Sequence, residues 1–361
     1  MPPLHAPRLM ADHRIGEFEL IRRLRRTTPL HPPVASSVVV GIGDDAAVLK
    51  LNAGRVLLAT TDLLAEGVHF DLACITYRQL GYKAAMANLS DIAAMGGIPR
   101  FALITVALTP RETPGDVEEV YAGIRTACRP AGTVVVGGDT SASRIGLFLS
   151  ITVLGEASPQ AVLRRSGAHP GDRLYVTGTL GDAQAGWEIL RAHTHGLRRR
   201  TVNARYTAYL VERHIAPTAR LREGRTLAEG GLASAAIDLS DGLAGDLRHI
   251  CEESGVSADI ALDRLPLSPA LIAHARAQRR NPTEYALSGG EDYELLFTVP
   301  AKSVSRVEAL IHRKKMYATA IGTITARRQG LRMIGPDNTV HPLTARGYEH
   351  PIGPKGQAGP K

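Results

Sequence analysis

The chain has 361 residues, of which 44% are hydrophobic and 22% charged, so it can form a substantial core and more than one domain. No apolar run reaches the roughly 18–20 residues that span a bilayer, and the N-terminus lacks the apolar core of a signal peptide, so we expect no membrane partner. The formal charge of +8 means that nucleic-acid binding has to be considered. The basic clusters are short and lack interleaved aromatics, so we expect a solvated surface and no nucleic-acid partner.

Hydrophobic periodicity and turn residues predict the elements of the first half. Helices are expected over 16–26, over 77–95, where an Ala-rich run ends at a Gly-Gly-x-Pro stop, and over 114–128, which has acids in its first turn. Strands are expected over 38–42, 47–51, 56–60, 101–108, 134–136 and 147–154. This mixture of strands and helices is typical of an α+β or α/β fold.

A stretch rich in Pro, Gly and polar residues over 158–172 predicts a domain boundary. Beyond it we expect strands over 174–177, 235–237, 295–299 and 318–324, helices over 182–192, 243–254 and 303–312, and a flexible basic loop over 193–201. We therefore divide the chain into an extension (1–15), an N-terminal domain (16–157), a C-terminal domain (158–350) and a flexible tail (351–361).

One pattern recurs: a short apolar strand, small residues, then aspartate. It occurs at Gly43-Asp44-Asp45, Thr60-Thr61-Asp62, Gly137-Gly138-Asp139 and Asp238-Leu239-Ser240-Asp241. Open sheets present their ligands at strand ends, and small neighbours leave room for a phosphate and its metal. Each aspartate taken singly can also be a turn former or a helix N-cap. Four in one context favour a nucleotide site with several magnesium ions, which take oxygen ligands.

Asp91 is the most informative single residue. It lies inside the Ala-rich helix, on the same face as Ala84, Ala87 and Asn88, a face that otherwise looks buried. Because an unpaired buried carboxylate is costly, we expect it to contact a cation, with magnesium favoured over a distant arginine.

Two common nucleotide motifs are excluded. The run from Gly41 to Ala46 fits a G-x-G-x-x-A fingerprint, but the residues after it alternate like a strand and open no helix. No P-loop and no D-F-G or H-R-D triplet is present. ATP would therefore bind through a different scaffold.

A second focus is the run from Leu287 to Leu295. Its paired glycines, Gly289 and Gly290, permit close approach of the backbone to a ligand, and Glu291 and Asp292 supply acid, although a tight hairpin entry explains the same pattern. His69, seven residues after Asp62, is a candidate substrate contact or a structural histidine.

Taken together, the motifs resemble those of the thiamine-monophosphate kinases, in the aminoimidazole-ribonucleotide-synthetase-like superfamily. The resemblance runs in order from about Gly16 to Tyr348. It rests on these runs: Gly16-Glu17-Phe18-Glu19, Gly41-Ile42-Gly43-Asp44-Asp45-Ala46-Ala47, Thr60-Thr61-Asp62 with His69, Asn88-Leu89-Ser90-Asp91-Ile92, Gly137-Gly138-Asp139-Thr140, Arg165-Ser166-Gly167, Asp238-Leu239-Ser240-Asp241-Gly242 and Ser288-Gly289-Gly290-Glu291-Asp292-Tyr293-Glu294.

The resemblance implies an N-terminal sheet domain that pairs with its twin in a homodimer, a C-terminal α/β domain, and ATP with several Mg²⁺ ions between them. Carried over position by position, it implies magnesium ligands at Asp45, Thr60, Thr61, Asp62, Asp91, Asp139, Asp238 and Asp241. It implies ATP contacts at Gly138, Arg165 and Ser240, and substrate contacts at His69, at one acid of Glu291 and Asp292, and at Tyr348. Near that tyrosine, Pro351 stands where an aromatic residue is expected.

The implied reaction is direct transfer of the ATP γ-phosphoryl group to thiamine monophosphate, giving thiamine diphosphate and ADP. A phosphate acceptor is already anionic at neutral pH, so no side chain is expected as acid or base. The difficulty is to bring two polyanions together, which metals and an arginine achieve.

Other functions stay open on the sequence alone. The nearest is a superfamily enzyme with a different acceptor, although the reactive cysteines of the selenide and hydrogenase-maturation enzymes have no counterpart here. A non-catalytic nucleotide sensor and a basic RNA-binding protein come from other classes. The three cysteines (Cys74, Cys128, Cys251) are far apart, so we expect neither a disulfide framework nor a zinc site, and we expect a cytoplasmic location.

Overall fold

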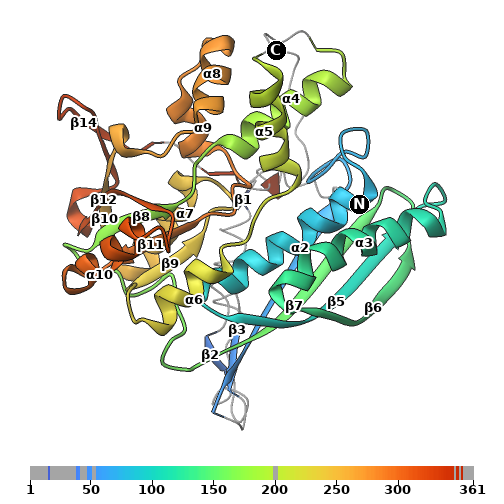
Figure 1. Cartoon of the computed structure of the whole chain (residues 1–361), viewed down its shortest axis with the longest axis horizontal. Coiled ribbons are helices and arrows are strands. Elements are labelled where there is room, and N and C mark those ends of the chain that lie inside the picture. The colour runs from blue at the N-terminus through green and yellow to red at the C-terminus, as the bar shows by residue number, and fades with distance from the viewer. Residues whose placement is uncertain are drawn as a thin grey trace, which may run out of the picture.

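The computed structural model describes residues 15–16, 38–40, 47–50, 54–197, 202–344, 347–348 and 351–352. Two large sheets, each with its own helices, make up most of the described part of the chain, and α2 and α3 cover one side of the first sheet (Figure 1). The fold is thus an α/β arrangement of two units. Among the described residues, no helix is both long and apolar enough to cross a membrane.

The first sheet has six strands in the order β2-β3-β4-β7-β5-β6. Its pairs are antiparallel except β5 and β6, which are parallel because α3 crosses over between them. The bounds are β2 (Val38–Val40), β3 (Ala47–Lys50), β4 (Val56–Ala65), α2 (Tyr77–Ala94), β5 (Ile98–Leu108), α3 (Pro114–Ala131), β6 (Val134–Ala142) and β7 (Phe148–Ala157).

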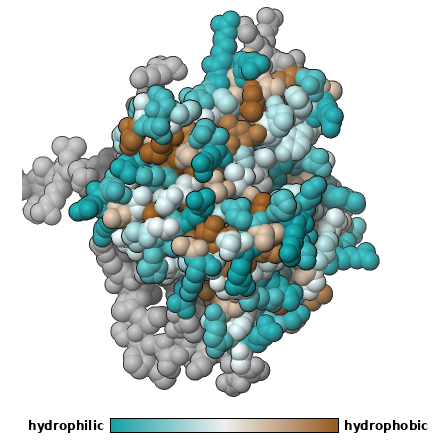
Figure 2. Space-filling view, turned by 60° about the vertical axis from the view of Figure 1, so that its left-hand side comes forward, coloured by the Kyte–Doolittle hydropathy of each residue, from teal (hydrophilic) through white to brown (hydrophobic). Residues whose placement is uncertain are grey.

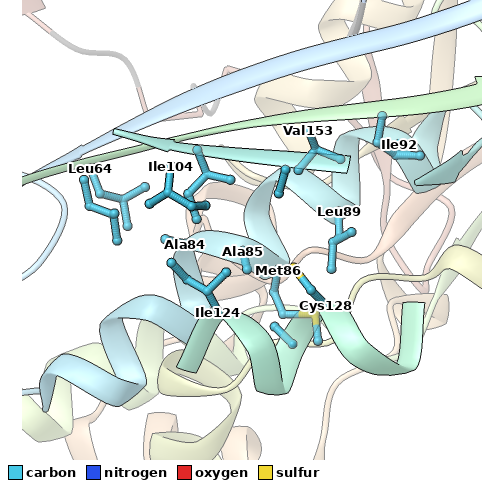
Figure 3. Close-up of a cluster of buried hydrophobic side chains, with 14 of the residues drawn as sticks. Leu64, Ala84, Ala85, Met86, Leu89, Ile92, Ile104, Ile124, Cys128 and Val153 are labelled. Atoms are coloured by element: carbon cyan, nitrogen blue, oxygen red, sulfur yellow. The ribbon is translucent and has the colours of Figure 1, made fainter. Parts of the chain in front are cut away.

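Period-two alternation gives the first sheet two unlike faces. Leu64, Ile104 and Val153 point toward α2 and α3, where they form a buried core with residues of both helices (Figure 3). On the opposite face large apolar side chains are exposed: Leu63 (54%), Phe101 (47%), Leu103 (37%) and Val134 (55%).

Helices α2 and α3 cross at two glycines. A Cβ atom on Gly81 would lie 2.0 Å from the carbonyl oxygen of Val120, and one on Gly123 would lie 1.9 Å from that of Arg78. Only glycine permits this separation of the two backbones. The α2 helix begins with a capping box, in which Thr76 accepts from Gln79 N and the Gln79 side chain accepts from Thr76 N.

The second sheet has seven strands in the order β14-β13-β10-β12-β8-β11-β9. Its strands are β8 (Arg173–Thr177), β9 (Ala235–Asp238), β10 (Val256–Ala261), β11 (Leu295–Val299), β12 (Ala318–Ala326), β13 (Arg332–Ile334) and β14 (Val340–Pro342). Its helices are α4 (Asp182–Thr194), α5 (Ala204–Ile215), α6 (Leu221–Glu229), α7 (Leu243–Ser254), α8 (Pro269–Gln278), α9 (Pro282–Ser288) and α10 (Ala301–His312).

Most of the elements expected from the sequence are confirmed, with ends that differ by a few residues. The helix over 243–254 and the strand over 295–299 keep their predicted bounds. The Ala-rich helix ends one residue early, whereas β4 continues five residues beyond 60. Elements α5, α6, β10, α8, α9, β13 and β14 were not expected.

The described ends of the chain pair with each other. Ile15–Gly16 (β1) and Pro351–Ile352 (β15) form a two-stranded antiparallel sheet. Gly16, the first residue of the helix expected over 16–26, is therefore in a strand, and the rest of that helix lies outside the described residues. The first two residues of the expected tail are paired as well, and 353–361 lie outside the described residues.

Candidate functional site

Strand β4 and helix α2 bring three of the predicted metal ligands together. Side chains two positions apart on a strand share a face, so Thr60 and Asp62 lie on the same face of β4 as the core-facing Leu58 and Leu64. This is the face that α2 covers. The Thr60 hydroxyl donates a hydrogen bond to Oδ2 of Asp91. The sequence predicts a cation as the partner of Asp91. The structure shows in addition that the Thr60 hydroxyl holds the Asp91 carboxylate in a fixed orientation.

Tyr293 shows that acids of both sheets converge on one place. Its ring is buried, and burial raises the pKa of its phenol, as do the negative charges of Glu291, Asp62, Asp238 and Asp91, in that order. Asp62 and Asp91 belong to the first sheet and its helix, whereas Asp238 ends β9 of the second sheet. The site therefore lies between the two units.

A second group of acids surrounds the turn between β9 and α7. Asp238 and Asp246 are buried, Asp241 is half-buried, and the backbone N–H of Asp241 donates to Oδ2 of Asp246 at 3.2 Å. Burial raises the pKa of Asp246 well above its ordinary value, and the charges of Asp241 and Asp238 add to that effect, while Arg165 opposes it. Such crowding of carboxylates is relieved by a bound cation.

The donors of this site fit magnesium that arrives with a nucleotide. They are all oxygen atoms, as Mg²⁺ prefers, and it is usually held by one or two carboxylates together with substrate phosphates. Among the described residues, no three of these carboxylates have oxygens within 4.8 Å of one another. An all-protein cage is therefore absent from this part of the chain, and phosphate oxygens would complete the coordination.

Thr61 and Asp139 lie on the opposite face of the first sheet. The Thr61 hydroxyl donates to Ile151 O at 3.2 Å and accepts from the Thr152 hydroxyl at 2.9 Å. Asp139 on β6 lies opposite Thr105 on β5. Thr105 lies opposite Ser150 on β7, and Ser150 lies opposite Leu63 on β4, so Asp139 shares the exposed face with Leu63. Within one chain, the structure does not bring these two predicted ligands to Asp62.

Of the remaining predicted metal and ATP residues, Arg165 and Ser240 lie at the acidic turn, whereas Gly138 lies in the first sheet. Asp45 lies outside the described residues. Gly138 packs so closely on β5 that a Cβ atom would be 1.7 Å from Ile104 O. Arg165 acts electrostatically on Asp246, and the Ser240 carbonyl accepts the backbone N–H of Glu291 at 2.8 Å.

Glu291 is held by two buried cationic or ionisable groups. Its Oε1 lies 2.8 Å from Lys83 Nζ, and its Oε2 lies 3.2 Å from His214 Nδ1. Lys83 comes from α2 and His214 from α5, and the two side chains are themselves 3.3 Å apart. Burial opposes ionisation of Glu291, but Lys83 and His214 outweigh it and lower the pKa of the carboxyl. One third of the Glu291 side chain remains exposed.

The other predicted substrate residues have backbone partners. His69 Nδ1 accepts the N–H of Ala65 at 3.0 Å, at the end of β4. Asp292 is buried and accepts the N–H groups of Gly181 at 2.6 Å and Ala183 at 3.2 Å, so it caps α4. Tyr348 is half-exposed, and its N–H donates to Asp241 O at 2.9 Å, so its segment borders the acidic turn.

Sequence reasoning missed three residues at this site. Lys83 lies in the Ala-rich helix eight residues before Asp91. A lysine within that apolar helix was the one feature of the sequence that could have indicated it. His214 gave none, since its helix was not expected. Asp246 falls in the first turn of α7, where an acid is ordinary because it complements the helix dipole.

The comparisons with known proteins agree with this geometry. Residues 43–157 match the N-terminal domain of AIR synthase related proteins, and residues 169–334 match their C-terminal domain. The chain thus has the two-domain architecture of that class.

Within that class, one family is close to the chain. The thiamine-monophosphate kinase of Salmonella typhimurium is 39% identical over 340 residues, which cover 93% of this chain and 98% of that protein. A solved structure described as AaThiL complexed with AMPPCP and TMP has a TM-score of 0.77 at 35% identity, covering 93% and 97% of the two chains. The thiamine-monophosphate kinase structure from Stenotrophomonas maltophilia has a TM-score of 0.70 at 35% identity, covering 90% and 98%. The chain belongs to the thiamine-monophosphate kinase family.

Proposed function

We propose that this chain transfers the γ-phosphoryl group of ATP to thiamine monophosphate, giving thiamine diphosphate and ADP. The observation that carries the proposal is the convergence of Asp62, Asp91 and Asp238 from two domains around Tyr293. The family relationship supports the choice of acceptor, since a relative's structure is described as a complex with AMPPCP and TMP.

The residues of the chain would act by position and charge. Asp62, Asp91, Asp238 and Asp241 would hold Mg²⁺, which neutralises phosphate charge when it is bound. Thr60 keeps one oxygen of Asp91 oriented by its hydrogen bond. Arg165 would balance the anionic charge beside the acidic turn. No side chain is required as a general base, because the acceptor phosphate is already an anion.

His69, Glu291 or Asp292, and Tyr348 remain our proposed substrate contacts. Of the two acids, Glu291 is the better candidate, because its side chain is one-third exposed whereas Asp292 is buried against the start of α4. Thiamine monophosphate carries a cationic ring, which an ionised Glu291 would attract.

We also propose that two copies pair through the open face of the first sheet. Four large apolar side chains are exposed there, and a sheet face that exposes several large apolar side chains is typical of an interface. Thr61 and Asp139 lie on the same face, so a second copy would cover them. The domain limits 16–157 and 158–350 belong to this proposal, as does a cytoplasmic location.

The test is to incubate the purified chain with ATP, Mg²⁺ and thiamine monophosphate and to follow thiamine diphosphate by chromatography. We expect metal-dependent product, reduced by about 10²-fold or more in Asp62→Ala, because a ligand of the Mg²⁺ that offsets phosphate repulsion is lost. The control is Asp263→Asn, an exposed carboxylate in the second domain, which should keep full activity.

Absence of product while ATP still binds would refute this acceptor and point to another acceptor within the superfamily. ATP binding without turnover of any acceptor would indicate a nucleotide sensor. Retention on heparin without either activity would favour the RNA-binding alternative. On the face shown in Figure 2, hydrophilic residues predominate, with smaller groups of hydrophobic residues among them.

A further inference from the structure

A group of three side chains outside the predicted metal set has the composition of a transition-metal site. Asp71, Cys74 and His195 offer a carboxylate oxygen, a sulfur and an imidazole nitrogen, and these atoms all lie within 4.8 Å of one another. Asp71 Oδ2 is 3.1 Å from His195 Nε2. The sequence predicted no zinc site because the cysteines are dispersed, but the fold brings together residues that are 124 positions apart.

The first two of these residues sit on one fixed turn. Oδ1 of Asp71 accepts the N–H of Ala73 at 2.8 Å, and the Asp71 carbonyl accepts the N–H of Cys74 at 2.8 Å. Because one carboxylate oxygen is tied to the turn, the other is directed toward His195. The turn follows β4 and precedes α2, so it belongs to the first domain.

The third residue comes from the end of α4, in the second domain. His195 is the C-cap of that helix, and its N–H donates to Arg191 O at 3.0 Å. The preceding Thr194 contacts the turn twice: its hydroxyl donates to Ala73 O at 3.4 Å and accepts from Cys74 Sγ at 3.5 Å. The end of α4 is therefore docked on the turn, which keeps the three donor atoms within 4.8 Å of one another.

We propose that Asp71, Cys74 and His195 bind one divalent transition-metal ion of the zinc class, which joins the two domains. In a tetrahedral site, nitrogen and oxygen ligands at about 2.0–2.2 Å from zinc are about 3.3 Å apart, close to the observed separation of Asp71 and His195. Cys74 has to move by an amount on the order of 1 Å to complete the set. The side chains of Asp71 and His195 are 33% and 48% exposed, which leaves room for water as the fourth ligand.

The donor types separate this site from the catalytic one. Sulfur and imidazole ligands select zinc, cobalt or similar ions, whereas the site around Tyr293 offers carboxylate and hydroxyl oxygens suited to magnesium. Without a metal, the same three residues are only a hydrogen-bonded contact between the domains. An ion that binds the folded chain and not the unfolded chain would also raise its melting temperature. The inference does not depend on the proposed function.

The test uses cobalt(II) as a spectroscopic probe on the purified full chain, with excess Mg²⁺ to occupy the oxygen sites. We expect a thiolate-to-cobalt charge-transfer band that saturates at one equivalent, and its loss when zinc is added. The band should vanish in Cys74→Ser, and the affinity should fall by at least about tenfold in His195→Ala. His193→Ala is the matched control, because this exposed histidine lies two residues away in the same helix end.

Zinc should raise the melting temperature of the wild-type chain and leave that of Cys74→Ser unchanged. Circular dichroism will show whether each variant is folded, and a serine at a half-buried position preserves the shape of the turn. No charge-transfer band in the wild-type chain, or a band that survives in Cys74→Ser and so arises from Cys128 or Cys251, would overturn the proposal.

Discussion

At the scale of single residues, the contact among Lys83, Glu291 and His214 fixes the loop that follows α9. Lys83 is 1% exposed and His214 3% exposed, so neither group has water to replace its partner. Glu291 and Tyr293 both have positive φ angles, 68° and 51°, which residues other than glycine adopt only when the surroundings enforce them. Lys83 and His214 supply that restraint on Glu291, and so position the loop carrying Tyr293 beside the aspartates.

Lys83→Met is expected to destabilise the chain by about 2–4 kcal/mol, because it leaves Glu291 without its nearest cation. The value is below that of a fully buried pair, since one third of Glu291 is exposed. Lys83→Met with Glu291→Gln should cost less than the sum of the two single changes. Urea unfolding of the four proteins measures the coupling, with the exposed Lys302→Met as control. Strictly additive costs would show that the ion pair contributes nothing.

Asp292 makes stability depend on pH. Burial raises the pKa of its carboxyl from 3.8 to about 7, although Arg213 opposes the change. The folded chain thus keeps a proton that the unfolded chain releases near pH 4, so the free energy of unfolding falls as pH rises from about 4 to about 7. The contribution of this group is about 1.4 kcal/mol per pH unit within that window.

Asp292→Asn should remove this slope, because the amide does not titrate and its oxygen can still accept an N–H at the start of α4. The measurement is the difference in unfolding free energy between wild type and variant at several values between about pH 5 and about pH 8. Asp263→Asn, at an exposed position, should give a constant difference. A constant difference for Asp292→Asn as well would mean that Asp292 is ionised throughout.

At the scale of elements, the position of α2 decides where Asp91 lies. The helix is buried on almost every side, because it packs on the first sheet, on α3 and against α6 and β9 of the second domain. Its separation from α3 is set by Gly81 and Gly123, each of which faces a backbone carbonyl of the other helix.

Gly81→Ala is therefore expected to destabilise the chain by about 1–3 kcal/mol or more, since the added methyl group must push the two backbones apart. Gly115→Ala is the matched control: it lies in the first turn of α3, where the nearest atom to an added Cβ is 3.7 Å away. Thermal unfolding measures the melting temperatures of both variants, and that of Gly81→Ala should be the lower. Equal melting temperatures would show that the crossing of α2 and α3 is not a tight constraint.

At the scale of the whole molecule, the two faces of the first sheet have different surroundings. One face packs on α2 and α3 and carries Thr60 and Asp62 toward the second domain. The other carries Thr61 and Asp139, together with exposed apolar side chains, and it is the face through which we propose that two copies pair.

If this face joins two copies, Phe101→Asp with Leu103→Asp should convert a dimer into a monomer, because like charges would replace apolar contacts in a buried surface. Light scattering coupled to size-exclusion chromatography measures the molar mass. Val340→Asp, at an exposed apolar position on β14, should leave the mass unchanged. A wild-type chain that is already monomeric would contradict the pairing.

Local sequence determined much of the fold and predicted the type of the site. Helix α2 and strands such as β4 follow from periodicity and stop signals, because these act over a few residues. The recurring strand-Asp pattern indicated a metal-nucleotide site for the same reason. Helices α5 and α6 were missed, since their polar segments become helical by packing against neighbours that the local pattern does not reveal.

Only the tertiary structure decided which of these residues meet. Alternation along β4 separates Thr61 from Thr60 and Asp62, but which face turns toward the second domain depends on where α2 packs. His214 and His195 reach Lys83 and Asp71 across the domain boundary, through contacts between residues more than 100 positions apart. Residue types and local spacing therefore specify the chemistry that the chain can perform, whereas long-range packing assembles the site, because convergence of distant segments leaves no mark in local sequence.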